Sequence, residues 1–239
     1  MILKISPLNK RRINNFVSNK RGLYSFWIFT FLFVFSLFAD FIANEKPLIL
    51  KYNSAFYFPI FKSYSETEFG GDFETEADYL DPYVINLINN NGWMIMPIIP
   101  YSYNTIIKDM ETPAPSPPSY KNWLGTDDQA RDVFSRLIYG FRISVLFGFT
   151  LTFFSMIIGV SAGAIQGYFG GKTDLFFQRF MEIWSAIPTL YVLIILASVI
   201  QPNFWWLLII LLIFSWMGYV GVVRAEFLRA RNFDYIRAA

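Results

Sequence analysis

Residues whose side chains could carry out chemistry are few in this chain, and the densest group precedes a long apolar run. Asp127, Asp128 and Asp132 lie close together in the sequence, as the paired carboxylates of a hydrolase do. Arg131 and Arg136 are interleaved with them, and such a mixture more often forms ion pairs and helix caps. The chain has no Cys and no His, which excludes thiolate nucleophiles, histidine general bases and the usual zinc sites. We therefore expect a protein that is not an enzyme and that holds no cofactor or metal.

The segment GYFGGKT at 167–173 ends like a loop that binds nucleotide phosphates. That loop requires a Gly five positions before its second Gly, and Gln166 occupies this place. The segment also joins two apolar runs instead of a strand and a helix. We therefore expect a cytoplasmic turn in which Asp174 caps the next helix, without nucleotide binding.

The composition indicates a membrane protein. Of its 239 residues, 54% are hydrophobic, 20% are aromatic and 16% are charged, and the mean hydropathy is +0.37. Soluble domains usually carry about 25% charged residues. The net charge of +2 is too small to indicate binding to nucleic acid.

Four apolar runs are long enough to cross a bilayer, whose core is matched by about 20 helical residues. They are residues 23–43, 143–165, 183–200 and 204–223. We predict an all-α polytopic membrane protein with four transmembrane helices and a large periplasmic insertion after the first. The last two runs are separated only by Gln201, Pro202 and Asn203, which predicts a tight turn between antiparallel helices.

Lysine and arginine near the ends of the spans predict the orientation. Residues 1–22 contain six basic residues and no acidic one, and the C-terminal segment is also rich in arginine. Both termini are therefore expected in the cytoplasm. The predicted segments between the spans are a periplasmic cap at 44–142 with a Pro-rich connector at 112–119, a cytoplasmic loop at 166–182 and a cytoplasmic C-terminal segment at 224–239.

Two features of the spans indicate how they pack. Gly159, Gly163 and Gly167 recur every four residues, a pattern that lets another helix approach closely in a membrane. Arg179 and Glu182 are spaced for an ion pair just before the third span, and Pro188 is expected to kink it. Arg142 is expected to extend from the outer end of the second span to the membrane boundary.

Three stretches resemble dipeptide/oligopeptide ABC-importer permeases of the C type. They are NWLGTDDQARDVFSRLIYGFRISVLFG at 122–148, RFMEIWSAIPTLYVLI at 179–194 and VVRAEFLRARNFDYIRAA at 222–239. Within that family, the segments AFYFP, DFETEADYLDP and PAPSPPSYKNWLGTD are similar to the microcin C importer permeases. The residues that match the signature before the second span, at 122–142 and just beyond, are Leu124, Gly125, Thr126, Asp127, Arg131, Asp132, Ser135, Arg136, Gly140, Arg142 and Ser144. Ala130 departs from it, because the family usually has Gly there.

The resemblance implies an inner-membrane permease subunit that moves peptides by alternating access and performs no covalent chemistry. Its implied partners are a second, B-type permease, cytoplasmic ATPase subunits, a periplasmic peptide-binding protein and the lipid bilayer. Arg237, Ala238 and Ala239 match the start of the family's ATPase-coupling motif. The family continues with two further spans, of about six, so the resemblance predicts a C-terminally truncated permease.

Two alternatives remain open at this point. The long, aromatic-rich segment predicted outside the membrane, residues 44–142 (the outer segment), is compatible with a membrane-anchored periplasmic binding or scaffold protein. The early end within the coupling motif is compatible with an inactive remnant of a permease.

Overall fold

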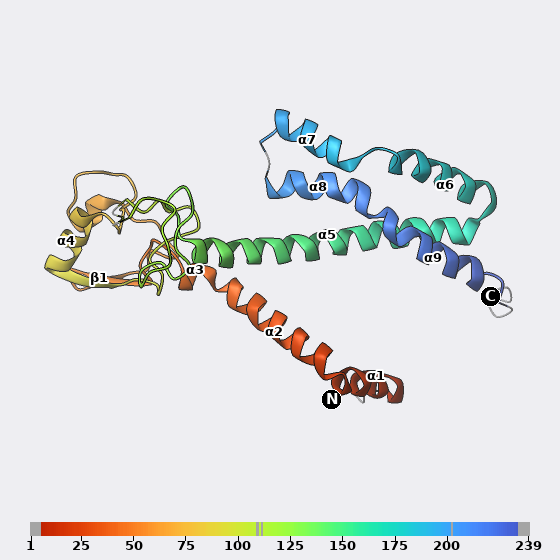
Figure 1. Ribbon diagram of the computed structural model, residues 1–239, viewed down its shortest axis with the longest axis horizontal. Coiled ribbons are helices and arrows are strands. Elements are labelled where there is room, and N and C mark those ends of the chain that lie inside the picture. Colours follow the sequence, from red (N-terminus) through yellow and green to blue (C-terminus); the bar gives the residue numbers. More distant parts are fainter. Residues whose placement is uncertain (1–5, 109, 111, 202, 234–239) are drawn as a thin grey trace. The chain divides into compact units, whose positions relative to one another are not determined.

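The computed structural model describes residues 6–108, 110, 112–201 and 203–233 (Figure 1). The chain divides into two compact units, residues 1–143 and 144–239, and each is described by itself. The prediction of a largely helical protein is confirmed, although the outer segment also contains a small β-sheet.

The first unit begins with three helices, α1 (Pro7–Ser18), α2 (Lys20–Leu37) and α3 (Ala39–Ile42). Ser6 caps α1 by accepting a hydrogen bond from the backbone N–H of Asn9. Asn19 alone separates α1 from α2, and its side chain caps α2 by accepting from the N–H of Gly22. The apolar run at 23–43 therefore forms two helices, which are interrupted at Phe38.

The outer segment contains an antiparallel sheet of three strands in the order β2-β1-β3, which corrects the all-α prediction. The strands are β1 (Ile49–Tyr52), β2 (Ala55–Tyr57) and β3 (Gly92–Ile95). Leu50 and Tyr52 are buried and Lys51 between them is more exposed, the alternation expected of a strand with one covered face. Two residues with positive φ, Asn53 and Ser54, form the tight turn from β1 to β2.

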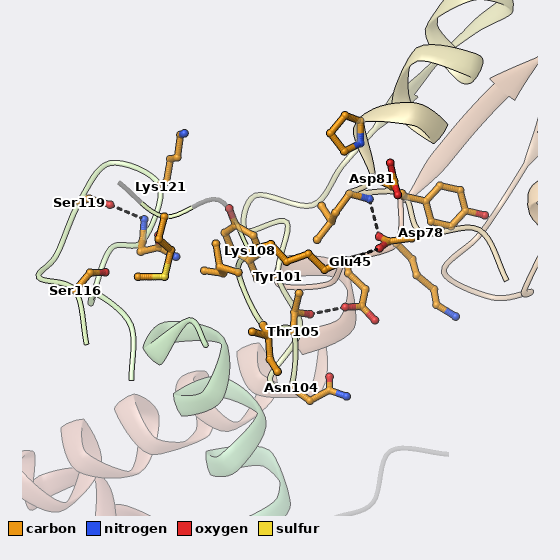
Figure 2. Close-up of a pocket in the computed structure, with 18 of the residues that line it drawn as sticks. Glu45, Asp78, Asp81, Tyr101, Asn104, Thr105, Lys108, Ser116, Ser119 and Lys121 are labelled. Atoms are coloured by element: carbon orange, nitrogen blue, oxygen red, sulfur yellow. Dashed lines mark hydrogen bonds and ion pairs between the residues drawn. The ribbon is translucent and has the colours of Figure 1, made fainter. Parts of the chain in front are cut away.

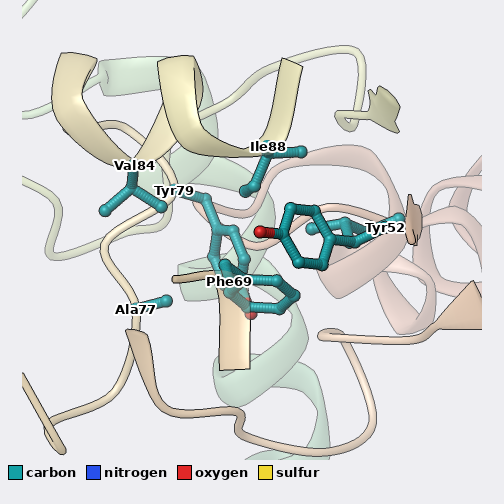
Figure 3. Close-up of a cluster of buried hydrophobic side chains, with 7 residues drawn as sticks. Tyr52, Phe69, Ala77, Tyr79, Val84 and Ile88 are labelled. Atoms are coloured by element: carbon teal, nitrogen blue, oxygen red, sulfur yellow. The ribbon is translucent and has the colours of Figure 1, made fainter. Parts of the chain in front are cut away.

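A short 3₁₀ helix, η1 (Glu66–Phe69), and the helix α4 (Pro82–Asn91) cover this sheet. Phe69 is fully buried, and the rings of Tyr52, Tyr57 and Tyr79 contact it with centroids 5.3–6.0 Å away. Figure 3 shows the Tyr52, Phe69 and Tyr79 rings gathered beneath α4. The buried members of this core are Leu50, Tyr52, Phe69, Ala77, Tyr79, Val84 and Ile88. The outer segment thus has a hydrophobic core of its own.

A second cluster attaches the outer segment to the two helices beneath it. Ala39 and Ala43 at α3 are buried against Ile99 of the outer segment and against Ile138 and Tyr139 at the start of α5 (Val133–Phe169). Ala43 and Ile99 also form an isolated β-bridge. The outer segment is therefore held by both helices through which the chain enters and leaves it.

The second unit contains the rest of α5, followed by α6 (Gly171–Ser185), α7 (Thr189–Val199), α8 (Phe204–Ser215) and α9 (Met217–Ala230). By length and composition, α5 and the nearly continuous helix Phe204–Ala230 are each able to cross a membrane. A third crossing results if α6 and α7, which meet at a bend of 61°, count as one broken span.

Three expectations from the sequence need correction in this unit, and they concern the loop at 166–182, the capping role of Asp174 and the third span. The predicted loop at 166–182 is almost entirely helical, because α5 continues to Phe169 and Gly170 alone makes the turn into α6. Gly170 has a φ of 62°, a left-handed conformation that favours glycine. Asp174 is consequently not the N-cap of α6 but lies within its first turn.

The predicted third span, 183–200, is not one continuous helix. It is broken between Ser185 and Thr189, directly before α7. Pro188 disfavours a helical conformation at the residue before it and donates no backbone hydrogen bond, which accounts for the break. The 11 helical residues of α7 extend about 16 Å, roughly half of a bilayer core.

The turn between α7 and α8 falls partly outside the described residues, since Pro202 is one of those left out. The two helices themselves lie side by side (Figure 1). Leu193 and Leu196 of α7 and Trp206 and Ile210 of α8 line one small apolar pocket. The hairpin that the sequence predicts is therefore present.

Candidate functional site

The contact between α5 and α9 is a close approach of two long apolar helices in the second unit. A Cβ atom on Gly163 would lie 2.8 Å from the carbonyl oxygen of Val220 and 2.9 Å from the Cβ of Val223. Side chains do not tolerate such distances, so only glycine permits this approach. The same close approach occurs at Gly159 against Trp216 and at Gly167 against Phe227. The predicted glycine series thus lies along the contact with α9.

The direction of α9 relative to α5 follows from these contacts. Each step of four residues along α5, from Gly159 to Gly167, moves the contact from Trp216 to Val220 and then to Arg224. The two helices therefore run in the same direction. Because they are parallel, α6 and α7 between them must carry the chain back (Figure 1).

Polar side chains lie at both ends of this glycine contact. The hydroxyls of Ser155 on α5 and Ser215 on α8 are hydrogen-bonded to each other at one end. Gln166 is fully buried at the other end, where its Oε1 accepts from Nε2 of Gln178 at 3.0 Å. Hydrogen bonds between helices are a main source of cohesion where no water is present. These pairs fix the register of α5 against α8 and α6.

Asp174 and Arg224 join the first turn of α6 to α9. Nε and Nη2 of Arg224 donate to the two carboxylate oxygens of Asp174 at 2.5 and 2.6 Å. Such two-pronged pairs between guanidinium and carboxylate are strong and fix orientation as well as distance. The spacing of these two residues, 50 positions apart in the chain, gave no sequence signal for this pair.

Arg179 and Glu182 form the ion pair that their spacing indicates, with Nη1 and Oε2 2.6 Å apart on one face of α6. Both side chains are exposed, so the pair contributes little to stability. Pro188 lies one residue before α7, at the bend. These three residues therefore lie along the broken helix formed by α6 and α7.

Asp127 is the centre of the ion pairs before α5. Its carboxylate accepts from Nε of Arg131 at 2.9 Å and also pairs with Arg136. Burial raises the pKa of Asp127, but hydrogen bonds from the Arg131 side chain and from the backbone N–H groups of Arg131 and Gln129 lower it to about 2. Asp127 is thus a structural group that is ionised at neutral pH, and the ion-pair interpretation of this acidic stretch is confirmed.

Asp132 caps α5. It is fully buried, accepts from the backbone N–H of Ser135 at 2.7 Å and accepts from Nδ2 of Asn122 at 2.9 Å. Ser135, also buried, donates its hydroxyl to the carbonyl of Tyr101 at 2.9 Å. These signature residues therefore tie the start of α5 to the outer segment.

Gly125 and Thr126 hold the Pro-rich connector. Gly125 has a φ of 74°, and a Cβ atom there would collide with the carbonyl oxygen of Ser116. Thr126 is buried, and its N–H and Oγ1 bond to the backbone of Ser116. Ala130 has a φ of 58°, which explains why glycine suits this position in the family. Three further signature residues, Leu124, Gly140 and Ser144, are exposed.

Arg142, expected at the outer end of the second span, is partly buried and forms an ion pair with Asp40. Its Nη1 lies 2.7 Å from Oδ2 of Asp40 in α3, and its guanidinium lies over the ring of Tyr139 at 4.7 Å. The Tyr139 hydroxyl donates to Oδ1 of Asp40 at 2.8 Å. Sequence reasoning missed this cluster, although Asp40 is the one charge in the first apolar run and such charges require a partner.

The outer segment contains a cavity of about 1320 Å³ between the cap and the Pro-rich connector. Figure 2 shows Ser116, Ser119 and Lys121 on one side, and Glu45, Asp78 and Asp81 on the other. Several of these groups already have partners, since Glu45 accepts from Thr105 and Asp81 caps α4. The lining of the cavity is partly apolar and partly polar, and it carries charges of both signs.

Across the described residues, no group of three or more acidic side chains is arranged to hold a metal ion. The segment 167–173 lies at the end of α5 and the start of α6, without the strand that a phosphate-binding loop follows. Arg237, Ala238 and Ala239, the predicted start of the coupling motif, lie outside the described residues.

Comparison with known proteins gives concordant matches. Residues 137–239 match the family described as binding-protein-dependent transport system inner membrane component. The chain is 54% identical to the inner membrane ABC transporter permease protein YejE of Escherichia coli K12, over 99% of this chain and 69% of the relative.

Two further relatives broaden the comparison. The peptidoglycan transport system permease protein YejE of Agrobacterium fabrum is 52% identical over 98% of this chain and 68% of its own length. The oligopeptide transport system permease protein OppC of Haemophilus influenzae is 36% identical over 66% of this chain and 49% of its own length. The similarity thus includes the outer segment in the first two relatives and is shorter in the third.

Proposed function

This chain belongs to the family of binding-protein-dependent ABC transporter permeases of the inner membrane, and from this premise we propose that it crosses the membrane four times and forms a peptide pathway with a second permease. It is a multi-pass transport subunit and not itself an enzyme. Membership of the family implies a substrate-binding protein and an ATPase as partners. The peptide cargo is proposed from the names of the relatives, which transport oligopeptides or peptidoglycan.

The parallel contact between α5 and α9 is the observation that carries the topology. Two parallel helices that both cross the bilayer need a third crossing between them, and only α6 with α7 is available for it. With α2 as the first span, the chain has four crossings, and both termini lie on one side. The basic residues at 1–22 favour the cytoplasm for that side. Residues 44–142 then form the periplasmic insertion.

The residues of the candidate site take roles in this scheme. Gly159, Gly163 and Gly167 hold α9 against α5, so that the two helices move as one body. The bend at Pro188, next to the pair of Arg179 and Glu182, provides a hinge in the third span. The ATPase side of the chain is residues 224–239, which include Arg237, Ala238 and Ala239. The signature residues from Leu124 to Ser144 hold the outer segment in place on α5.

Reconstitution tests this proposal. The chain is purified with the second permease and the ATPase, inserted into vesicles and supplied with a peptide-loaded binding protein. ATP hydrolysis and peptide uptake should both rise over the level with the empty binding protein. Omission of the chain is the matched control. Peptide uptake that proceeds equally without the chain would contradict the proposal.

The cavity in the outer segment favours one secondary candidate, a periplasmic binding function of the cap itself. The full chain in detergent, without partners, would then bind peptide, and changes at Lys121 and Asp78 would weaken that binding. The permease proposal expects no peptide binding by the chain alone. Isothermal titration with the same peptide separates the two.

A further inference from the structure

The N-terminal helix α1 presents an apolar face and a basic face that contact little else. Its apolar side chains are Leu8, Ile13, Phe16 and Val17, which are 60%, 49%, 44% and 50% exposed. At the helical repeat these positions fall on one half of the circumference, which also contains Asn9 and Arg12. Lys10 and Arg11 fall on the other half, together with Asn14, Asn15 and Ser18. A helix with such faces is stable when its apolar half is covered.

The charges of α1 are unbalanced. Lys10, Arg11 and Arg12 lie in α1 and Lys20 and Arg21 start α2, while residues 1–22 contain no acid. Within the described part of the chain, none of these five cations takes part in an ion pair. Arg12 falls between the Leu8 and Phe16 positions, where an aliphatic stem can be buried while its guanidinium reaches water.

The connection to α2 limits where α1 can be. Only Asn19 separates the two helices, and the rings of Phe16 and Phe26 meet edge to face with centroids 5.8 Å apart. The apolar part of α2 begins at Leu23, within two turns of the end of α1. If α2 crosses the membrane, α1 lies at its surface.

We infer that α1 lies flat in the membrane boundary, with its apolar half among the acyl chains and its cations on anionic lipid headgroups. This inference rests on the proposed crossing by α2. Two observations favour lipid over an acidic protein or a nucleic acid. The side chains of both halves are exposed, and α1 is attached to the start of the proposed first span. A lipid surface satisfies both halves at once, as it does for other interfacial helices.

Because the chain has no Cys, one introduced Cys places a fluorescent label at a single position. The full chain carrying Val17→Cys on the apolar half, or Asn14→Cys on the polar half, is labelled with an environment-sensitive dye. It is inserted into vesicles of phosphatidylcholine, alone or with about a third phosphatidylglycerol. Quenching by iodide, which stays in water, measures the exposure of the label.

We expect the label at residue 17 to be quenched several-fold less than the label at residue 14 in the anionic vesicles. This protection should weaken in neutral vesicles. The combined change Lys10→Gln, Arg11→Gln and Arg12→Gln should lower the partition of α1 onto the anionic surface by about 100-fold and remove the protection. The matched control removes three cations from the outer segment, at Lys51, Lys62 and Lys108, and should leave the protection unchanged.

Three results would overturn the inference. In the first, the labels at residues 17 and 14 are quenched equally in both kinds of vesicle. In the second, protection at residue 17 does not depend on phosphatidylglycerol. In the third, protection at residue 17 appears only when the ATPase or RNA is added. A label at Phe31→Cys, within α2, separates this failure from failure of the proposed topology. Protection at residue 31 without protection at residue 17 refutes only the interfacial position of α1, whereas quenching at both also refutes the proposed span.

Discussion

Asp174 and Arg224 form a two-pronged ion pair that fixes the start of α6 to α9, with donor–acceptor distances of 2.5 and 2.6 Å. The guanidinium of Arg231, at the end of α9, lies close to Gly170 in the turn between α5 and α6. The end of α5, the first turn of α6 and the last turns of α9 therefore meet at one point. A displacement of α9 must carry the start of the broken helix with it.

Loss of this pair should weaken the second unit. Arg224→Gln leaves the Asp174 carboxylate without its two charged donors, and we expect the free energy of unfolding to fall by about 2 kcal/mol. Asp174→Asn should have a similar effect. Exchanging the two residues, Asp174→Arg with Arg224→Asp, should recover part of the loss. Thermal unfolding in detergent compares these variants and the double variant Asp174→Asn/Arg224→Gln with the unmodified protein. If the effects of the two single changes simply add in the double variant, the pairing is contradicted.

The contact between α5 and α9 predicts opposite effects for two glycine changes in the same helix. Gly163→Ala forces apart α5 and α9, because the new Cβ meets the Val220 carbonyl oxygen and Val223. We expect it to destabilise the protein by about 1–3 kcal/mol. Gly148→Ala is the matched control, since a Cβ atom at Gly148 has no neighbour within 4 Å and alanine favours the helix. Thermal unfolding that lowers the midpoint equally in both variants would contradict the packing of α9 on Gly163.

These glycines were predictable because their signal is local and periodic. The bend at Pro188 is likewise predictable from a single residue. The pairing of Arg179 with Glu182 is predictable from their spacing of one helical turn. The full length of α6 is not predictable in this way, because the charged residues at 172–182 resemble a loop when their partners are unknown. Asp174 has its partner 50 residues later, and only the fold brings Arg224 to it.

The small β-sheet of the outer segment shows a second limit of prediction from the sequence. The alternation of Leu50, Lys51 and Tyr52 before Asn53 and Ser54 is typical of a hairpin, but the strand is only four residues long. Strand β3, which completes the sheet, lies some 40 residues further along the chain. Pairing over such distances depends on burial of Phe69 among tyrosines, which no local pattern reports. The separate core of this segment therefore required the structure.

The Asp127 carboxylate predicts a defined dependence of stability on pH. Its pKa in the folded protein is lowered to about 2, so its contribution is complete above its ordinary pKa and is lost as the pH falls from about 4 to about 2. Because solvent screens this group, we expect the shift to contribute no more than about 1 kcal/mol at neutral pH. Asp127→Asn should lower the unfolding midpoint at pH 7 and have little effect at pH 2. Asp128→Asn removes the same charge one residue later without these hydrogen bonds, and a loss as large as that of Asp127→Asn would show that net charge alone is responsible.

The cluster of Asp40, Tyr139 and Arg142 predicts that the ion pair between Arg142 and Asp40 of α3 helps to hold α2 beside α5. The rings of Phe29 and Phe141 lie 5.9 Å apart on these helices, so cysteines at both positions should react with one short thiol cross-linker. Arg142→Gln leaves Asp40 unpaired at the end of an apolar run, and we expect the yield of cross-linked protein to fall several-fold. Arg136→Gln removes a charge from the same helix but from the Asp127 cluster, and it should leave the yield unchanged. Equal yields in the Arg142→Gln and unmodified backgrounds would show that the contact between α2 and α5 rests on apolar packing alone.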